Sequence, residues 1–280
     1  MKLITVESNG VARAGALIND TEFVDVSAAG DVMTIMSDAA ARVKAQQLAA
    51  SGIPEALSGV KLLAPITPRN LICIGLNYME HCRETNSVVP TRPVIFAKFN
   101  NALANPGDTI TWHQDTTTTV DYEAELGVII GKPTHRVAKE DALNYVGGYT
   151  CVNDVSARDI QNSDSGKQWV LGKTPDGFCP IGPTLVTTDD IPDPQALDIK
   201  CILNGQVVQS SNTKDMIFDV ATLIAHLSRF MTLQPGDLIS TGTPFGVGVS
   251  RKPPLWMKDG DVVVVELENI GQLVNHIHVL

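Results

Sequence analysis

The chain has 280 residues, of which 44% are hydrophobic and 19% charged, so it can bury a sizeable core in one large domain or in one domain with a small module. A net charge of −10, no apolar run long enough to span a bilayer and no signal-peptide core at residues 1–5 argue against nucleic-acid partners and membrane binding. The five cysteines form no CxxC pair and fit reduced, mostly buried thiols in a cytoplasmic protein.

The first 65 residues are predicted to form a small module of strands and one helix. Three alternating runs within residues 2–26, separated by turn signals, predict an antiparallel meander. A helix is expected next, with Ser37 or Asp38 as its N-cap and Gly52 after its end. Two prolines among residues 64–68 interrupt any regular element, so we place a boundary near residue 65 and predict modules at 1–65 and 66–280.

The segment after this boundary carries the first candidate catalytic group. Residues 70–76 predict a buried strand, which leads into His81 and Glu84. On a helix these two side chains would be neighbours, and a hydrogen bond from Glu84 would orient the imidazole and raise its basicity. A surface ion pair is the alternative. Residues 87–93 are predicted to be irregular and exposed, as in a mobile lid, and residues 94–99 predict a strand that carries one lysine.

Residues 120–130 alternate as a β-strand and place three acidic side chains, Asp121, Glu123 and Glu125, on one face. Like charges side by side on a strand of buried character require water, protons or a cation. A solvated strand face and a metal site are therefore the two interpretations of this stretch.

A second polar set follows at residues 153–161. Asp154, Arg158 and Gln161 are spaced i, i+4 and i+7, so a helix beginning here would present all three on one face. Either Asp154 caps this helix and pairs with Arg158, or Asp154 binds a metal while Arg158 and Gln161 bind a substrate carboxylate and carbonyl. Lys173 then follows an apolar run.

The remainder is predicted to be mostly β. Asn204-Gly205 predicts a hairpin, and an apolar stripe over residues 213–230 predicts a core helix on which His226 is structural. Residues 237–248 join a strand to a glycine-rich loop that lacks the Gly-Lys-Ser/Thr of a nucleotide P-loop. Its backbone N–H groups and the Thr243 hydroxyl suit an anion. Two further strands are expected at residues 261–266 and 271–279.

Taken together, five blocks in this order resemble the fumarylacetoacetate hydrolase family, and they span roughly residues 70–275. They are Gly75-x-Asn77-Tyr78-x-x-His81-x-x-Glu84, Asp121-Tyr122-Glu123-Ala124-Glu125-Leu126, Asn153-Asp154-Val155-Ser156-Ala157-Arg158-Asp159-x-Gln161, Lys173 before Pro175, and Ser240-Thr241-Gly242-Thr243-Pro244. The N-terminal module looks like that of bacterial members. The resemblance implies an α+β, predominantly β fold with a mixed β-roll catalytic domain, usually in a homodimer.

The resemblance also implies a metal site. Glu123, Glu125 and Asp154 match the carboxylates that hold Mg²⁺ or Mn²⁺ in the family. Three carboxylates with no Cys or His in the motif make an all-oxygen site, which suits Mg²⁺, Mn²⁺ or Ca²⁺ rather than zinc. Such a site leaves coordination positions for water and for a small keto-acid substrate.

The activity that the resemblance implies first is metal-dependent hydrolysis of a C–C bond in acylpyruvates such as fumarylpyruvate, through an enolate that the metal stabilises. In this role His81, oriented by Glu84, would activate water. Lys173 would neutralise the enolate or deliver a proton, and Lys98 is a weaker candidate for the same task.

Substrate binding is assigned in the same way to Arg158, Gln161 and Thr243. The alternative activity is isomerisation of 2-hydroxyhepta-2,4-diene-1,7-dioate or decarboxylation or tautomerisation of oxaloacetate, which uses the same site and belongs with aromatic catabolism. A non-enzymatic interpretation is a metal-dependent binding protein with a structural acidic cluster. Such a protein would not need His81, Glu84 and Lys173 beside the metal.

Overall fold

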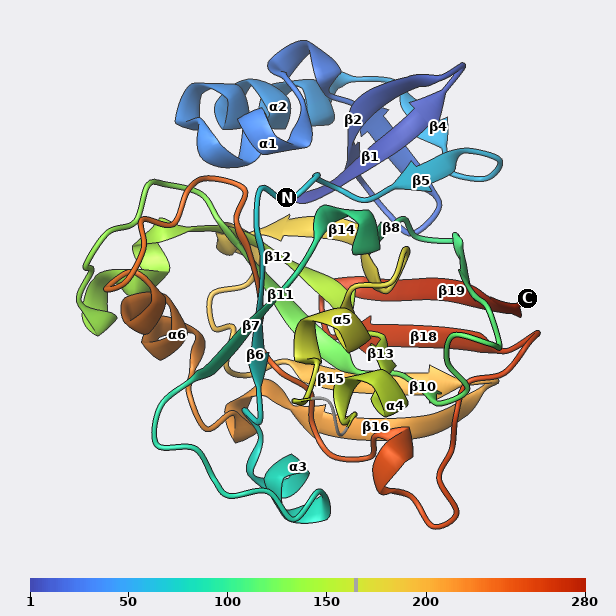
Figure 1. Cartoon of the computed structure of the whole chain (residues 1–280). Helices are drawn as coiled ribbons and strands as arrows, with labels where there is room; N and C mark the ends of the chain where they lie inside the picture. The colour runs from blue at the N-terminus through green and yellow to red at the C-terminus, as the bar shows by residue number, and fades with distance from the viewer. Residues whose placement is uncertain (164–165) are drawn as a thin grey trace.

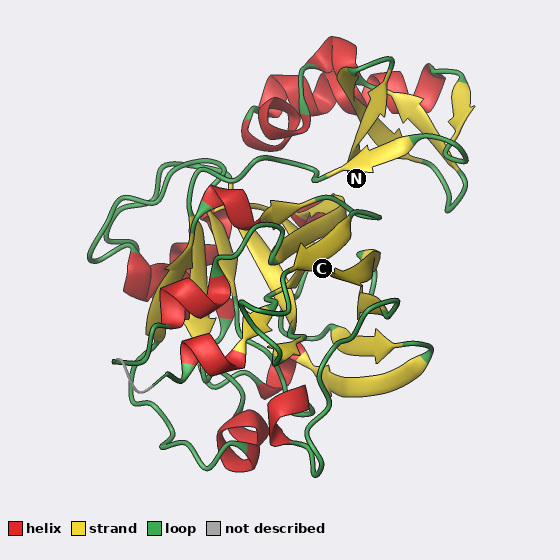
Figure 2. Cartoon of the chain, turned by 45° about the vertical axis from the view of Figure 1, so that its right-hand side comes forward, coloured by secondary structure: helices red, strands yellow, loops and turns green. Residues whose placement is uncertain are grey.

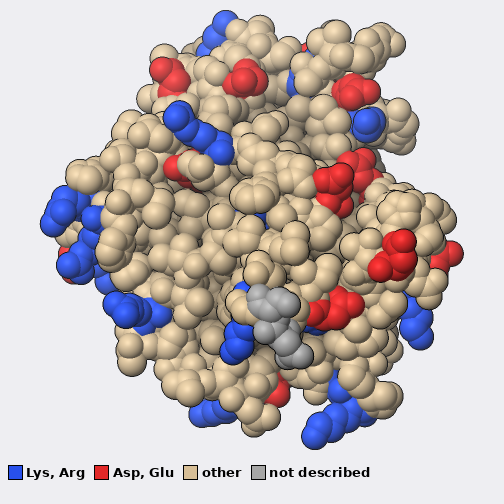
Figure 3. All heavy atoms as spheres, viewed as in Figure 1, with Lys and Arg blue, Asp and Glu red and all other residues tan. Residues whose placement is uncertain are grey.

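A computed structural model of the chain describes residues 1–163 and 166–280. The fold is α+β and mostly sheet, with parallel and antiparallel strand pairs, as predicted. None of the helices in the described residues combines the length and apolar character required to span a bilayer. Figure 3 shows acidic and basic side chains interspersed over one face of the molecule. All five cysteines are buried and free of disulfides, which confirms the expectation of buried thiols.

The largest sheet formed by the described residues has 12 strands (Figure 1). Its order is β4 (Pro54–Ala56), β3 (Glu22–Asp25), β2 (Val11–Leu17), β1 (Lys2–Ser8), β14 (Cys179–Thr187), β12 (Val146–Asn153), β11 (Ala124–Ile130), β17 (Leu238–Ser240), β6 (Leu71–Gly75) and β7 (Val94–Lys98). In addition, β5 (Lys61–Leu63) pairs with β1, and β8 (Leu103–Ala104) pairs with β14. Every residue of the central strand β11 is buried, so its acidic residue lies inside the molecule.

A second sheet of five strands packs against the centre of the first. Its order is β16 (Gln206–Asn212), β15 (Asp198–Leu203), β18 (Val262–Leu267), β19 (Gly271–Val279) and β9 (Thr109–Trp112). Leu126 and Val128 of β11 share the main hydrophobic cluster with Ile199 of β15 and Val265 of β18. The turn between β15 and β16 is the predicted hairpin, in which Asn204 and Gly205 both have positive φ, as a two-residue type I′ turn requires.

The N-terminal elements extend the large sheet, because β1 pairs with β14 through Lys2 and Val186. In Figures 1 and 2 they lie at one end of the molecule. The helices here are α1 (Val32–Ser37) and α2 (Ala39–Ser51). The Asp38 carboxylate accepts a hydrogen bond from the backbone N–H of Ala41 at the start of α2, and Gly52 follows its end, as predicted.

Other helices of the described residues are short. They are α3 (Met79–Glu84), α4 (Arg158–Gln161), α5 (Trp169–Lys173) and α6 (Val220–Leu227). Single 3₁₀ turns occur at Ser27–Ala29, Asn100–Ala102, Thr188–Asp190, Thr213–Asp215 and Gly248–Ser250, and a longer 3₁₀ segment at Lys139–Tyr145.

The helix predicted over residues 213–230 is shorter than its apolar stripe. Asp219 accepts a hydrogen bond from the backbone N–H of Thr222, so this N-cap starts α6 in the middle of the stripe. Phe230 lies beyond the end of α6 and is 72% exposed, with its ring 5.2 Å from that of His226. The N-cap therefore decided the boundary, and only residues 220–227 form the core helix.

The helix predicted from Asp154 is also wrong at its start. Ser156–Ala157 form β13, which pairs with β10 (Val120–Asp121), so α4 begins only at Arg158. This long-range strand pairing overrides the local helical spacing. It nevertheless brings residues 154–161 alongside the acidic stretch.

Candidate active site

Three buried carboxylates converge at the end of the β11–β12 ladder. Glu123, Glu125 and Asp154 each offer an oxygen within 4.8 Å of the others, and none of them is more than 5% exposed. Ala124 pairs with Asn153, so the next residues outward, Glu123 and Asp154, face each other across the two strands. The backbone N–H of Asp154 donates to the Glu123 carbonyl at 2.9 Å, which fixes this arrangement. The acidic strand face is therefore buried rather than solvated.

Two buried lysines neutralise part of this cluster. The Lys173 Nζ atom lies 2.6 Å from Glu123 Oε2 and 2.8 Å from Asp154 Oδ2. The Lys98 Nζ atom lies 2.7 Å from Asp154 Oδ1 and donates to the carbonyls of Val155 and Phe178. Each oxygen of Asp154 thus faces an ammonium group. Lys98 is bound mainly to backbone carbonyls, whereas Lys173 also reaches the cavity described below.

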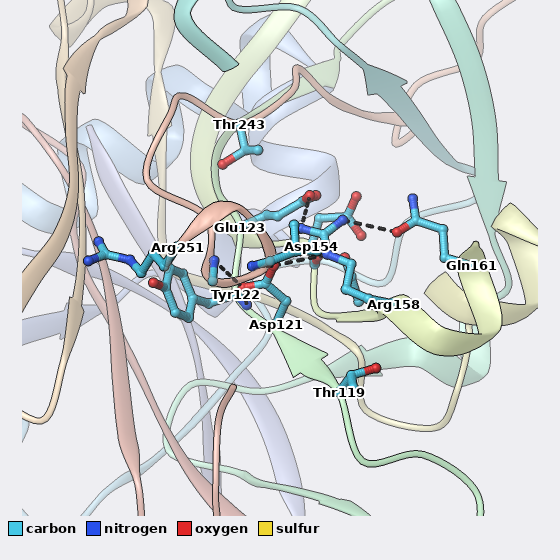
Figure 4. A network of polar contacts seen from close by, with 12 residues as sticks. Thr119, Asp121, Tyr122, Glu123, Asp154, Arg158, Gln161, Thr243 and Arg251 are labelled. Carbon is cyan, nitrogen blue, oxygen red and sulfur yellow. Dashed lines mark hydrogen bonds and ion pairs between the residues drawn. The ribbon is translucent and has the colours of Figure 1, made fainter. Parts of the chain in front are cut away.

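Arg158 and Gln161 lie beside the cluster and contact each other (Figure 4). The guanidinium donates from Nε to Asp121 at 2.9 Å, from Nη2 to Glu123 at 2.7 Å and from Nη1 to the Gln161 Oε1 at 3.0 Å. Arg158 therefore binds acidic side chains of the protein itself. It also contacts Gln161 through the amide oxygen, so the amide nitrogen of Gln161 takes no part in the contact with Arg158. Sequence reasoning gave Asp121 no role, although it stands on the acidic strand face.

The buried carboxylates of this region outnumber its cations. Four carboxylates, those named above and Asp121, meet three cations, Arg158, Lys98 and Lys173. Burial and the charges of Asp154 and Glu123 raise the pKa of Glu125 well above its usual range. Burial opposes ionisation of Glu123 as well, but the neighbouring Lys173 and Arg158 outweigh it and lower the pKa of Glu123. An all-oxygen donor set in which one carboxylate needs a further cation to ionise fits a hard divalent cation.

The predicted His81–Glu84 pair is present on α3. The Nδ1 atom of His81 lies 2.8 Å from Glu84 Oε1, and the other carboxylate oxygen of Glu84 accepts a hydrogen bond from the backbone N–H of Gly246. The His81 side chain is only 9% exposed. Because Nδ1 faces the carboxylate, Nε2 is the nitrogen left to exchange a proton with a ligand.

The glycine-rich loop after β17 binds carboxylates of the protein itself. The N–H groups of Gly242, Gly246 and Gly248 donate to the carboxylates of Glu125, Glu84 and Asp121 respectively. Thr243 donates its hydroxyl to the Ala124 carbonyl and accepts from the Gln209 amide. The sequence indicated an anion-binding loop; these anions prove to be the side chains that form the site.

Most of these groups line one cavity of about 570 Å³. Its lining includes His81, Glu84, Glu123, Glu125, Arg158, Gln161, Lys173 and Thr243, and thus eight of the nine predicted site residues. Residues that sequence reasoning missed also line it, notably Phe96 and Trp169, whose rings meet edge to face at 5.5 Å. Thr85 and Ser87 form part of the rim, and Val88 beyond them is 89% exposed in an irregular segment, as predicted.

A buried group of acids and lysines at the floor of a cavity, next to an oriented His–Glu pair, is the arrangement of an enzyme active site. Comparison of the chain with known proteins identifies the kind of enzyme. The chain belongs to the fumarylacetoacetate hydrolase family, since the protein-family sequence model described as "Fumarylacetoacetate (FAA) hydrolase C-terminal" matches residues 70–278.

Relatives in this family carry different activities. The chain is 52% identical over 219 residues to the oxaloacetate tautomerase fahd2, mitochondrial, of Xenopus laevis, covering 78% of this chain and 68% of that protein. It is similar to a fumarylacetoacetate hydrolase from Exiguobacterium antarcticum (37% identity, TM-score 0.86, all of both chains). It also resembles maleylpyruvate hydrolase from Sphingobium sp. SYK-6, solved with manganese(II) and pyruvate (30% identity, TM-score 0.84, 100% of this chain and 99% of that one).

Proposed function

We propose that the chain interconverts the keto and enol forms of a small α-keto acid, with oxaloacetate as the first candidate substrate. The observation that carries this proposal is the His81 imidazole, which Glu84 orients at 2.8 Å within the cavity that the acidic cluster lines. Keto–enol exchange requires a base that removes a proton from carbon and returns it to oxygen. The 52% identity to an oxaloacetate tautomerase supports the choice of substrate.

We also propose that Glu123, Glu125 and Asp154 hold Mg²⁺ or Mn²⁺. When bound there, the cation would polarise the keto group and neutralise the substrate carboxylate as a Lewis acid. The all-oxygen donor set of these residues and the mutual proximity of their carboxylates support this assignment. The presence of manganese in the Sphingobium relative supports it as well.

The side chains then have distinct tasks. His81 Nε2 removes a proton from the carbon next to the keto group, Glu84 stabilises the imidazolium, and the imidazolium returns the proton to the keto oxygen. The Lys173 ammonium lowers the free energy of the negative charge that develops on this oxygen. Gln161, held by Arg158, presents its amide nitrogen to a substrate oxygen. Thr243, through its hydrogen bond to the Ala124 carbonyl, positions the glycine-rich loop at the cavity.

A second candidate function is hydrolysis of the C–C bond of an acylpyruvate. The same His81–Glu84 pair would remove a proton from water instead of from carbon. Similarity to maleylpyruvate hydrolase favours this reaction, as does a cavity larger than a four-carbon acid needs.

The test is a direct assay of purified protein on oxaloacetate and on acylpyruvates, with added Mg²⁺ and with a chelator. Oxaloacetate exchange is followed by the ultraviolet absorbance of the enol, and acylpyruvate cleavage by the loss of the diketo absorbance. We expect Mg²⁺-dependent acceleration of oxaloacetate exchange. If only acylpyruvates are consumed, the hydrolase is the correct function; if neither substrate reacts, both proposals are wrong.

The proposal also covers the oligomeric state and the cellular compartment of the protein. We propose a homodimer, which light scattering after size-exclusion chromatography would reveal as twice the mass of the chain. Five buried free thiols fit a reducing compartment such as the cytoplasm. The Xenopus relative carries "mitochondrial" in its name, so fractionation of cells with an antibody against the chain distinguishes the two locations.

A further inference from the structure

The five-stranded sheet has a β-bulge where it meets the glycine-rich loop. Gln209 of β16 pairs with Cys201 of β15. The next residue of β15, Ile202, pairs with Val207, so Val208 is an extra residue in β16. Val208 and Gln209 are both buried, whereas successive side chains of a regular strand point to opposite faces. A bulge re-aims a side chain in this way, and bulges are common next to active sites.

The Gln209 amide is only 1% exposed and bonds to three partners at the active site. Its Oε1 atom accepts a hydrogen bond from the backbone N–H of Ala124 at 2.9 Å. Its Nε2 atom donates to the Thr243 hydroxyl and to the Pro244 carbonyl, both at 2.8 Å. Because an N–H only donates and a carbonyl only accepts, these partners hold the amide in one orientation.

These contacts belong to a closed ring of hydrogen bonds around the main chain of Ala124. The Thr243 hydroxyl, which accepts from Gln209, donates in turn to the Ala124 carbonyl at 3.0 Å. Farther along β11, at residues 127–129, strand β17 pairs with the main chain, but β17 ends at Ser240. At Ala124 the two side chains of Gln209 and Thr243 bind the main chain instead.

The position of Ala124 connects this ring to the acidic cluster. Its N–H belongs to the peptide group that joins it to Glu123, and its carbonyl to the peptide group that joins it to Glu125. These two carboxylates are among the three that converge in the site. Mg²⁺ requires a nearly ideal arrangement of its oxygen ligands, so a rotation of either peptide group would disturb the cluster.

The bulge has a second contact with the loop. The Val208 carbonyl accepts a hydrogen bond from Arg251 Nη2 at 2.5 Å. A Cβ atom at Gly246 would lie 2.4 Å from the same carbonyl oxygen, and Gly246 has a φ of 103°. Loop and strand therefore approach each other so closely that only glycine fits, and this approach fixes Gln209 relative to the loop.

We propose that Gln209 is a positioning residue, which sets the affinity of the acidic cluster for a divalent cation through the main chain of Ala124. The inference deepens the proposed function and rests on it for the cation. Gln209 is not among the residues that line the cavity, so it acts without contact to a ligand. Groups behind the ligands of a metal commonly orient those ligands and tune their affinity.

The test measures cation binding rather than turnover. Gln209→Met keeps the length of the side chain and removes all three hydrogen bonds. Calorimetric titration of the apoprotein should show an affinity for Mg²⁺ lowered about tenfold or more, the usual effect of losing a group that orients metal ligands. The electron paramagnetic resonance spectrum of bound Mn²⁺ should also differ from that of wild type, because it reports the arrangement of the ligands.

Gln195→Met is the matched control. The Gln195 amide also accepts from a backbone N–H, that of Val220, and donates to a backbone carbonyl, that of Thr213, both at 2.8 Å. It lies at the start of α6 and outside the cavity lining. The control should lower stability in urea and leave the affinity for Mg²⁺ unchanged. Thr243→Val, a second variant of nearly the same shape, opens the ring at another point and should weaken Mg²⁺ binding as well.

Equal Mg²⁺ affinity in wild type and in Gln209→Met, or an equal loss in Gln195→Met, would overturn the role of Gln209. If Gln209→Met does not fold, an unchanged affinity in Thr243→Val would overturn it. A wild type that binds no Mg²⁺ would reject the cation and this inference together. Weaker binding by Gln209→Met in a protein that converts neither oxaloacetate nor acylpyruvates would reject only the proposed reaction and leave the role of Gln209 standing.

Discussion

The Lys98 ammonium lies 2.7 Å from the Asp154 carboxylate, and neither side chain is more than 1% exposed to solvent. The two residues are far apart in sequence, one on β7 and the other directly after β12. With Lys173 on the second oxygen of Asp154, this ion pair sets the charge at the floor of the cavity. The stability of the fold and the chemistry of the site therefore depend on the same side chains.

Lys98→Met should destabilise the protein strongly. It removes a buried cation and leaves the Asp154 charge less compensated, a change that typically costs about 3–5 kcal/mol. Urea unfolding measures the loss. The control is Lys200→Met, which breaks a partly exposed pair with Glu266 at 3.1 Å and should cost about 0.2–1 kcal/mol. Similar losses in the two variants would mean that the buried pair contributes no more than a surface pair.

Glu125→Gln should weaken the binding of Mg²⁺ at least about tenfold, because an amide is a poorer ligand for a hard cation than a carboxylate. Gln keeps the size of the side chain and can still contact Ser240 and Gly242. Calorimetric titration of the apoprotein gives the affinity. Glu268→Gln, at an exposed position, serves as the control and should bind as wild type does. Unchanged affinity in Glu125→Gln would show that the cluster holds no cation.

His81→Ala should lower kcat/KM for oxaloacetate exchange by about 10²–10⁴, the usual contribution of a general base. Acylpyruvate cleavage should fall as much if the protein catalyses it, since water also requires a base. Decarboxylation of oxaloacetate needs no base and should fall far less. His226→Ala on α6 is the matched control and should retain activity within about twofold. If His81→Ala retains as much activity as His226→Ala, His81 is not the base of the proposed mechanism.

Residues 81–93 should be protected from hydrogen exchange when ligand binds. The segment is irregular beyond α3, and Thr85 and Ser87 form part of the cavity rim. Oxalate, a planar mimic of a pyruvate enolate, should slow exchange there in the presence of Mg²⁺. Mass spectrometry with and without oxalate measures the change, and the exposed turn at Asn204-Gly205 provides an internal reference. Equal exchange in both samples would exclude a closing lid.

Asp219→Ala should cost about 1 kcal/mol at neutral pH, because Asp219 caps α6. Burial raises the pKa of Asp219, but hydrogen bonds from Lys139 and Thr222 outweigh it and the pKa is lowered. A carboxyl with a lowered pKa stabilises the fold above its unfolded pKa of about 3.9 and loses that contribution as the pH falls through the folded value.

Urea unfolding at pH 7 and near pH 3 checks this dependence. The difference between wild type and Asp219→Ala should shrink at the lower pH. Asp219→Asn keeps a capping oxygen and should lose only a few tenths of a kcal/mol at pH 7. A difference that does not change with pH would show that the cap works without its charge.

Local patterns of the sequence were sufficient for much of the fold. The hairpin at Asn204-Gly205 and the ends of α2 at Asp38 and Gly52 depend on neighbouring residues, so they could be predicted. Spacing alone also placed Glu123 and Glu125 on the same side of a strand and His81 beside Glu84. Each of these relations spans four residues or fewer, or is marked by a capping or turn residue.

Other relations depend on which distant segments pair, and no local pattern encodes that. Arg158 was expected to meet substrate, but the pairing of β10 with β13 turns it towards Asp121 and Glu123. Lys98 could not be assigned its partner because Asp154 approaches it only through the tertiary fold. The long helix expected at 213–230 failed for a different reason, since the Asp219 cap outweighed the apolar periodicity.

In the loop after β17, the main chain must keep its conformation, whereas some side chains can vary. Its backbone N–H groups hold Glu84, Glu125 and Asp121, and a Cβ atom at Gly248 would lie 1.9 Å from the Leu255 carbonyl oxygen, so its main-chain path tolerates little change. The side chains that it and the following segment direct into the cavity carry none of those contacts. Evolution can therefore exchange a side chain such as Lys252, which lines the cavity, without moving the catalytic acids. A single ancestral reaction centre could in this way acquire new substrates by point mutation alone.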